Sequence, residues 1–202
     1  NKVFWNLTQE DIYKIILDRG EGKISKDGAM VVKTGIHTGR SAQDKFVVKE
    51  SNNKDSIWWD NAKEMSEENF DLLYSDMIEF SDNKDLFVQD LFGGADLEYR
   101  LPTRIYTEYA WHSLFIQNLL ITVKEEEKSK FDPEFVIIDM PSFKANPARH
   151  GSRSETIIAV NFDKKIVLIA GTSYAGEIKK SVFTMLNFLL PPKNVMPMHC
   201  SV

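Results

Sequence analysis

Cysteine is nearly absent from this sequence, because Cys200 is the single one among 202 residues. A chain with one cysteine forms no internal disulfide and no zinc site built from its own cysteine ligands. Scarce cysteine is also typical of proteins in a reducing compartment, so we expect a cytoplasmic protein. We expect Cys200 itself to behave as a small buried apolar residue.

Long apolar runs and excess positive charge are missing as well. No apolar stretch approaches the roughly 20 residues that a membrane-spanning helix needs, and the first residues form neither a secretory signal nor a basic transit peptide. The formal net charge is -5, which gives no general attraction to nucleic acid or to an anionic membrane. We therefore expect neither as a partner, while a local basic pocket stays compatible with this charge.

The apolar residues predict one core built from alternating strands and helices. Hydrophobic residues make up 43% of the chain, enough for one substantial core. Two β-branched runs, 156–162 and 166–170, are joined by a short polar turn and predict an antiparallel hairpin. Further strands are predicted at 29–32, 46–48, 86–88, 135–138 and 195–201, and helices after the N-caps Thr8 and Ser66 and at 108–120 and 178–190. The predicted class is α/β, with a mixed β-sheet flanked by helices.

A glycine-rich loop at 34–41 follows the strand predicted at 29–32. Glycines let backbone amides approach an anion closely, and the planar guanidinium of Arg40 matches a carboxylate or a phosphate. The loop is not a P-loop, because its glycines are not followed by Lys and then Ser or Thr. A tight turn that carries a surface arginine explains the same residues.

A second glycine-rich loop, at 171–176, follows a buried strand and opens the helix predicted at 178–190. A helix N-terminus attracts anions, so Lys179 and Lys180 in the predicted first turn oppose the helix dipole. A local rule broken at a junction between strand and helix is typical of a functional site. The alternative is that both lysines simply extend into water.

Histidines offer weaker signals. His199, in the predicted last strand, can bind a metal through a neutral imidazole, but a histidine hydrogen-bonded within the core is the commoner situation. We interpret His112 as a structural residue of the helix at 108–120, and His37 as a loop residue near the candidate site.

Taken together, these segments resemble ATP-dependent phosphoenolpyruvate carboxykinase. The matching stretches follow the family's order over nearly the whole chain and read TGIHTGRSAQDK (34–45), WW (58–59), TEYAWHSLF (107–115), GTSYAGEIKK (171–180), NFLLP (187–191) and MHCS (198–201). The ordered set is much more specific than any one stretch. The resemblance implies that residues 1–202 form the N-terminal, substrate-side domain of an enzyme of gluconeogenesis. That enzyme converts oxaloacetate and ATP into phosphoenolpyruvate, CO2 and ADP.

The resemblance also implies a role for particular residues. Arg40 would bind the carboxylate of oxaloacetate or phosphoenolpyruvate, and Tyr174 would pack against the substrate or the departing CO2. Lys180, as a neutral amine, and His199 would bind Mn2+. Further substrate-binding candidates are Lys179 and Ser41.

Three departures from the family's pattern limit what the chain is expected to do. It ends at Val202, before the P-loop, an Asp metal ligand and an Arg of the nucleotide-binding C-terminal domain, so the site for Mg2+-ATP lies outside it. Ala42-Gln43 replaces the usual Pro-Lys, and Thr122-Val123 replaces Arg-Pro. We expect the chain alone to be inactive. The alternative is a free-standing anion-binding or interaction domain that keeps the fold without catalysis.

Overall fold

A computed structural model describes residues 1–199 of the chain, so the predictions for Cys200 and for the end of the strand at 195–201 lie outside the described residues. The strands are β1 (Val3–Trp5), β2 (Gly22–Ile24), β3 (Met30–Val32), β4 (Lys45–Val48), β5 (Lys63–Met65), β6 (Leu86–Gly93), β7 (Leu101–Thr107), β8 (Ile121–Thr122), β9 (Phe135–Met140), β10 (Ile157–Asn161) and β11 (Ile166–Ala170). The helices are α1 (Gln9–Asp18), α2 (Glu67–Ser81), α3 (Ala110–Gln117), α4 (Glu125–Lys128), α5 (Pro147–His150) and α6 (Gly176–Leu189). Thr8 and Ser66 cap α1 and α2 as predicted.

Nine strands form one mixed sheet, which confirms the predicted fold class. Its order is β1-β6-β7-β9-β11-β10-β4-β5, with β8 paired to β6, and β2 and β3 form a separate ribbon. The predicted hairpin is present, because β10 and β11 pair antiparallel over their whole length. Most other neighbours run parallel, including β9 with β11 and β4 with β10.

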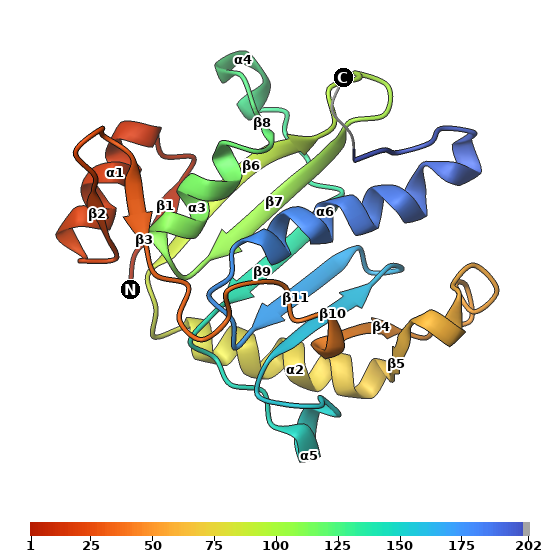
Figure 1. The fold of residues 1–202 in the computed structure, drawn as a ribbon. Helices are drawn as coiled ribbons and strands as arrows, with labels where there is room; N and C mark the ends of the chain where they lie inside the picture. The colour runs from red at the N-terminus through yellow and green to blue at the C-terminus, as the bar shows by residue number, and fades with distance from the viewer. Residues whose placement is uncertain (200–202) are drawn as a thin grey trace.

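Helices cover both faces of this sheet (Figure 1). On one face Ile178 of α6 packs in the same core as Ile137 of β9. On the other face Leu73 of α2 packs with Ile138, the next residue of β9. Successive side chains of a strand point to opposite faces, so this one strand contributes to both cores. Within the described residues, no helix has the length and apolar character that crossing a membrane requires.

One edge of the sheet gathers loops from distant parts of the sequence. Because β10 and β11 are antiparallel, the C-terminal end of β11 lies beside the N-terminal end of β10, with Ala170 paired to Ile157. Strand β4 runs parallel to β10 and begins at the same edge, where Lys45 pairs with Ile158. The loop before β4 and the loop after β11 therefore meet there, and these are the two glycine-rich loops of the sequence.

The strand predicted at 195–201 is wrong over its described part. Residues 195–199 have no strand structure, and Met196 and Met198 are 76% and 66% exposed. After α6 the chain makes a short turn at Pro191–Lys193, and Asn194 takes a left-handed conformation with φ of 59°. The chain reverses there without joining the sheet, and His199 lies beside Lys179 and Phe183 of α6.

Asp76 ties α2 to α5. Its carboxylate accepts a hydrogen bond from Nη2 of Arg149 at 2.7 Å and one from Nε2 of His150 at 2.9 Å. The Nδ1 atom of His150 accepts from the backbone N–H of Asn146, so Nε2 carries the proton. The hydrogen bonds from Arg149 and, to a lesser degree, His150 hold the pKa of the Asp76 carboxyl well below its usual range.

We expect Asp76→Asn to lower the free energy of unfolding at pH 7 by about 1.5 kcal/mol, the lower end of the range for charge-assisted hydrogen bonds, because the site is partly exposed. A lowered folded-state pKa stabilises the protein above the unfolded-state pKa near about 4, and this contribution is lost as the pH falls below it. Urea unfolding of both proteins at pH 7, 5 and 4 measures the effect. The difference should shrink between the last two values, and a constant difference over all three would contradict the assignment.

Candidate anion-binding site

The loop after β11 brings Tyr174 to the shared edge of the sheet. Gly171 has φ of 73°, and its carbonyl accepts the Thr156 hydroxyl at 2.9 Å. The N–H of Tyr174 donates to Oγ1 of Thr172 at 3.1 Å. A Cβ atom on Gly176, the first residue of α6, would lie 2.5 Å from Cε1 of Tyr174. The glycine therefore lets the Tyr174 ring rest against the start of the helix.

A buried His–Asp pair supports the same loop. His112 of α3 and Asp139 of β9 are 0% and 1% exposed, and Nδ1 of His112 contacts Oδ2 of Asp139. The Nε2 atom lies 3.0 Å from the carbonyl oxygen of Ser173, so it must carry a proton to donate. The contact between Nδ1 and Oδ2 also needs a proton, because two acceptors alone form no hydrogen bond. With both protons counted, the His112–Asp139 pair carries no net charge. Burial raises the pKa of Asp139, and the charge of His112 opposes this.

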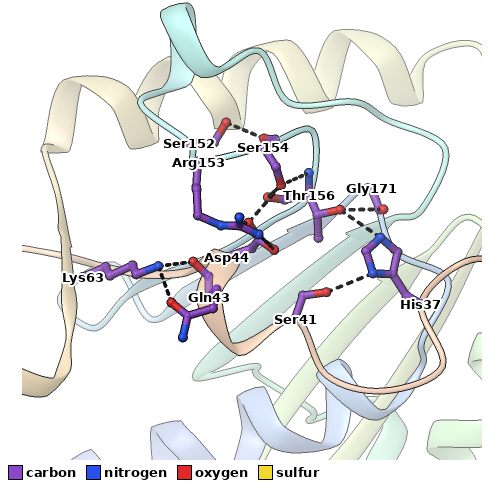
Figure 2. A network of polar contacts seen from close by, with 10 residues as sticks. All are labelled: His37, Ser41, Gln43, Asp44, Lys63, Ser152, Arg153, Ser154, Thr156 and Gly171. Atoms are coloured by element: carbon purple, nitrogen blue, oxygen red, sulfur yellow. Dashed lines mark hydrogen bonds and ion pairs between the residues drawn. The ribbon is translucent and has the colours of Figure 1, made fainter.

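His37 fastens the Arg40 loop to the sheet edge (Figure 2). Its Nε2 lies 3.2 Å from Oγ1 of Thr156, and its Nδ1 lies 3.2 Å from Oγ of Ser41. The Thr156 hydroxyl already donates to the Gly171 carbonyl, so it accepts from Nε2–H of His37. Nδ1 is then the acceptor, and the Ser41 hydroxyl donates to it. These donor and acceptor roles follow from counting the available protons.

Asp44 fixes the other end of the loop (Figure 2). Its carboxylate is 4% exposed and accepts two hydrogen bonds from the Arg153 guanidinium, at 2.9 and 3.0 Å. A third comes from the Ser154 hydroxyl at 2.9 Å. Arg40 thus lies between two anchored points of the chain.

Positive side chains surround a cavity of about 230 Å³ between this loop and α6. Arg40, Lys45 and Lys180 line it, together with the carboxylate of Glu177 and the hydroxyl of Thr184. The Nζ atom of Lys45 donates to Oγ1 of Thr184 at 2.7 Å. Three cations outnumber the one carboxylate, so the lining favours an anion.

The charges of this cavity shift one another's pKa values. Burial raises the pKa of Glu177, while the Ser41 amide and the Arg40 and Lys45 charges oppose the rise. Burial lowers the pKa of Lys45, and the neighbouring charge of Glu177 counteracts it. The positive charges of Arg40 and Lys180 lower the pKa of Lys45 further. An anion in the cavity would relieve this repulsion between cations.

The predicted site residues are only partly brought together. Arg40 and Lys180 line the same cavity, whereas Tyr174 lies on the adjoining loop. Nε2 of His199 lies 3.3 Å from Nζ of Lys179, and its ring centroid is 5.9 Å from that of Phe183. Helix α6 begins at Gly176 rather than 178, so Lys180 follows the first turn instead of lying in it.

The two predicted metal ligands form an incomplete donor set. Among the described residues, no three His, Cys, Asp or Glu side chains are grouped as a metal site would require. Nζ of Lys180 lies 5.4 Å from the centre of the Phe183 ring, which also packs against His199. Two nitrogen donors beside one ring are compatible with a shared metal only if further ligands come from outside the described residues.

Sequence reasoning missed Lys45 and Glu177 as site residues. Both lie in stretches that carry the family resemblance, at the end of 34–45 and within 171–180. A charged residue in a loop or at a helix start normally faces water, so the sequence gives no sign that these two line a cavity.

Comparisons with known proteins point to one family. The model of the phosphoenolpyruvate carboxykinase family matches residues 1–202. A curated protein of Parvibaculum lavamentivorans named "Phosphoenolpyruvate carboxykinase (ATP)" is 62% identical over 197 residues, which cover 98% of this chain and 37% of that protein. Proteins of the same name from Methylobacterium sp. and Brucella suis biovar 1 are 57% and 58% identical, over 99% and 98% of this chain. The chain spans 37% of the length of each of these relatives.

We expect His112→Leu to lower the free energy of unfolding by about 3–5 kcal/mol, because it leaves Asp139 buried without its partner. The double variant His112→Leu/Asp139→Leu removes both polar groups and should recover part of this loss. Denaturant unfolding of the 202-residue chain measures both variants. A double variant less stable than His112→Leu would contradict the account of the pair.

Proposed function

This chain belongs to the phosphoenolpyruvate carboxykinase family, as its ordered segments predict, and we propose that the protein it forms part of converts oxaloacetate and ATP into phosphoenolpyruvate, CO2 and ADP. The observation that carries the proposal is the cavity where Arg40 and Lys180 meet. Each comes from a different family-matching stretch, and the two are 140 positions apart in the sequence. The cations suit a substrate that carries two carboxylates.

Arg40 is the group proposed to bind a substrate carboxylate. It is exposed, and among the described residues no hydrogen bond or ion pair engages its guanidinium. A planar guanidinium binds a carboxylate with two parallel hydrogen bonds, which fixes the orientation of the substrate. Tyr174, held on its loop beside Gly176, would pack against the substrate or the departing CO2.

The chemistry requires positive charge beside the reacting atoms. Loss of CO2 from oxaloacetate leaves an enolate, and fixed cations placed where that charge develops lower the barrier. Lys180 would supply such a charge or a neutral nitrogen ligand, with Lys179 beside it. A Mn2+ ion held by Lys180, His199 and ligands from outside this chain would supply further positive charge. The enolate oxygen then attacks the γ-phosphoryl group of ATP, a step that depends mainly on positioning.

A second candidate function is anion binding by this chain alone. All three cations of the cavity lie within residues 1–202, so a dicarboxylate could bind here without turnover. The gene sequence after the codon for Val202 separates the two functions. A reading frame that continues into a P-loop supports the enzyme, and a stop codon supports the binding domain.

We expect the 202-residue chain to show no turnover with oxaloacetate, ATP and Mn2+, because it carries no P-loop motif and spans only 37% of the length of its relatives. A protein of the relatives' full length should be active under the same conditions. Coupled detection of phosphoenolpyruvate measures both. Turnover by the short chain at the rate of the long one would contradict the need for the missing part.

We expect Arg40→Ala in the full-length protein to lower kcat/KM for oxaloacetate by about 100-fold or more, the loss of one charge-stabilising contact. Lys33→Ala is the matched control, because Lys33 is an exposed cation of the same segment, and it should stay within about threefold of the wild type. Steady-state kinetics measures both variants. An Arg40→Ala enzyme as active as the control would refute the role of Arg40.

A further inference from the structure

Glu177 is a buried carboxylate that the proposed reaction leaves unexplained. It is 5% exposed and lines the cavity beside Arg40 and Lys180. A carboxylate repels an anionic substrate, and burying it costs free energy unless it is well paired. Its presence in a site for anions therefore calls for a second role.

A hydrogen bond that Glu177 accepts joins two segments that are far apart in the sequence. Its Oε1 accepts the backbone N–H of Ser41 at 2.7 Å, across 136 positions. Ser41 directly follows Arg40, and Glu177 lies three residues before Lys180 on α6. Residues three apart in a helix lie on the same face. The hydrogen bond thus fixes the backbone of the arginine relative to that of the lysine.

The Ser41 hydroxyl is held from a second direction. It donates to Nδ1 of His37, which Thr156 orients through Nε2 (Figure 2). Both hydrogen-bond donors of Ser41 are then engaged within the protein. In this arrangement Ser41 positions the loop, and the guanidinium of Arg40 is the group left to meet a ligand.

We propose that Glu177 is a positioning residue that holds the Arg40 loop in register with Lys180. The inference rests on the proposed function in taking Arg40 as the residue that binds the substrate carboxylate. In this role Glu177 acts through the Ser41 N–H. Without it, the loop keeps its anchors at His37 and Asp44 but loses the one to α6.

A double-mutant cycle in the full-length protein tests this inference. Glu177→Ala should lower kcat/KM for oxaloacetate by about 30-fold when Arg40 is present. In the Arg40→Ala background the same change should lower kcat/KM by less than about threefold, because the Glu177–Ser41 hydrogen bond acts by positioning Arg40. Glu177→Gln is the matched control. It keeps the side-chain volume and an acceptor oxygen for the Ser41 N–H, so it should recover most of the activity that Glu177→Ala loses.

Equal losses in the two backgrounds, or a Glu177→Gln enzyme as impaired as Glu177→Ala, would overturn the proposal. Hydrogen exchange of the Ser41 amide gives a readout that needs no activity. It should be about tenfold faster in Glu177→Ala and unchanged in Glu177→Gln. Unchanged exchange in Glu177→Ala would refute the positioning role of the Glu177–Ser41 hydrogen bond, whatever reaction the protein catalyses. Faster exchange in Glu177→Ala, together with a full-length wild type that has no carboxykinase activity, would refute only the proposed function. If Glu177→Ala does not fold, Glu177→Met, of similar length without the acceptor oxygen, replaces it in every arm.

Discussion

The antiparallel pairing of β10 with β11 sets the geometry on which the site depends. In a sheet whose other neighbours are mostly parallel, this one pairing brings the end of β11 to the edge where β10 and β4 begin. The loop that carries Tyr174 and the loop that carries Arg40 therefore meet, although they are more than a hundred residues apart. A parallel pairing at the same place would have put the two loops at opposite ends of the sheet.

Charge decides how these loops are held once they meet. Arg40, Lys45 and Lys180 face one small cavity and repel one another, and Glu177 is the carboxylate among them. Burial raises the pKa of Glu177 and lowers that of Lys45, and the positive charges of Arg40 and Lys180 lower the pKa of Lys45 further. Hydrogen bonds through His37 and through the His112–Asp139 pair fix the surrounding backbone without adding net charge. The arrangement leaves positive charge at the point where an anion would bind.

Much of the fold is predictable from the sequence, because strong local signals agree with the tertiary structure. The hairpin of β10 and β11 and the capped helices α1 and α2 are of this kind. Strand β5 is not predictable from local signals, because Lys63–Met65 has no apolar alternation and forms a strand by pairing with β4. Strand β6 runs to Gly93, beyond the predicted 86–88, because its backbone pairs with β7 over that length, where Asp90 lies opposite Arg104 and bonds to it at 2.7 Å. The meeting of Arg40 with Lys180 was expected from the family resemblance, whereas the burial of Glu177 appears only in the packed structure.

The most direct test of this account is a crystal structure of the full-length protein with a bound dicarboxylate. We predict that one carboxylate lies against the Arg40 guanidinium, with Lys180 on the same ligand and the Ser41 N–H still bound to Glu177. A dicarboxylate seated elsewhere, with Arg40 in solvent, would contradict the central claim that the two loops form one anion site.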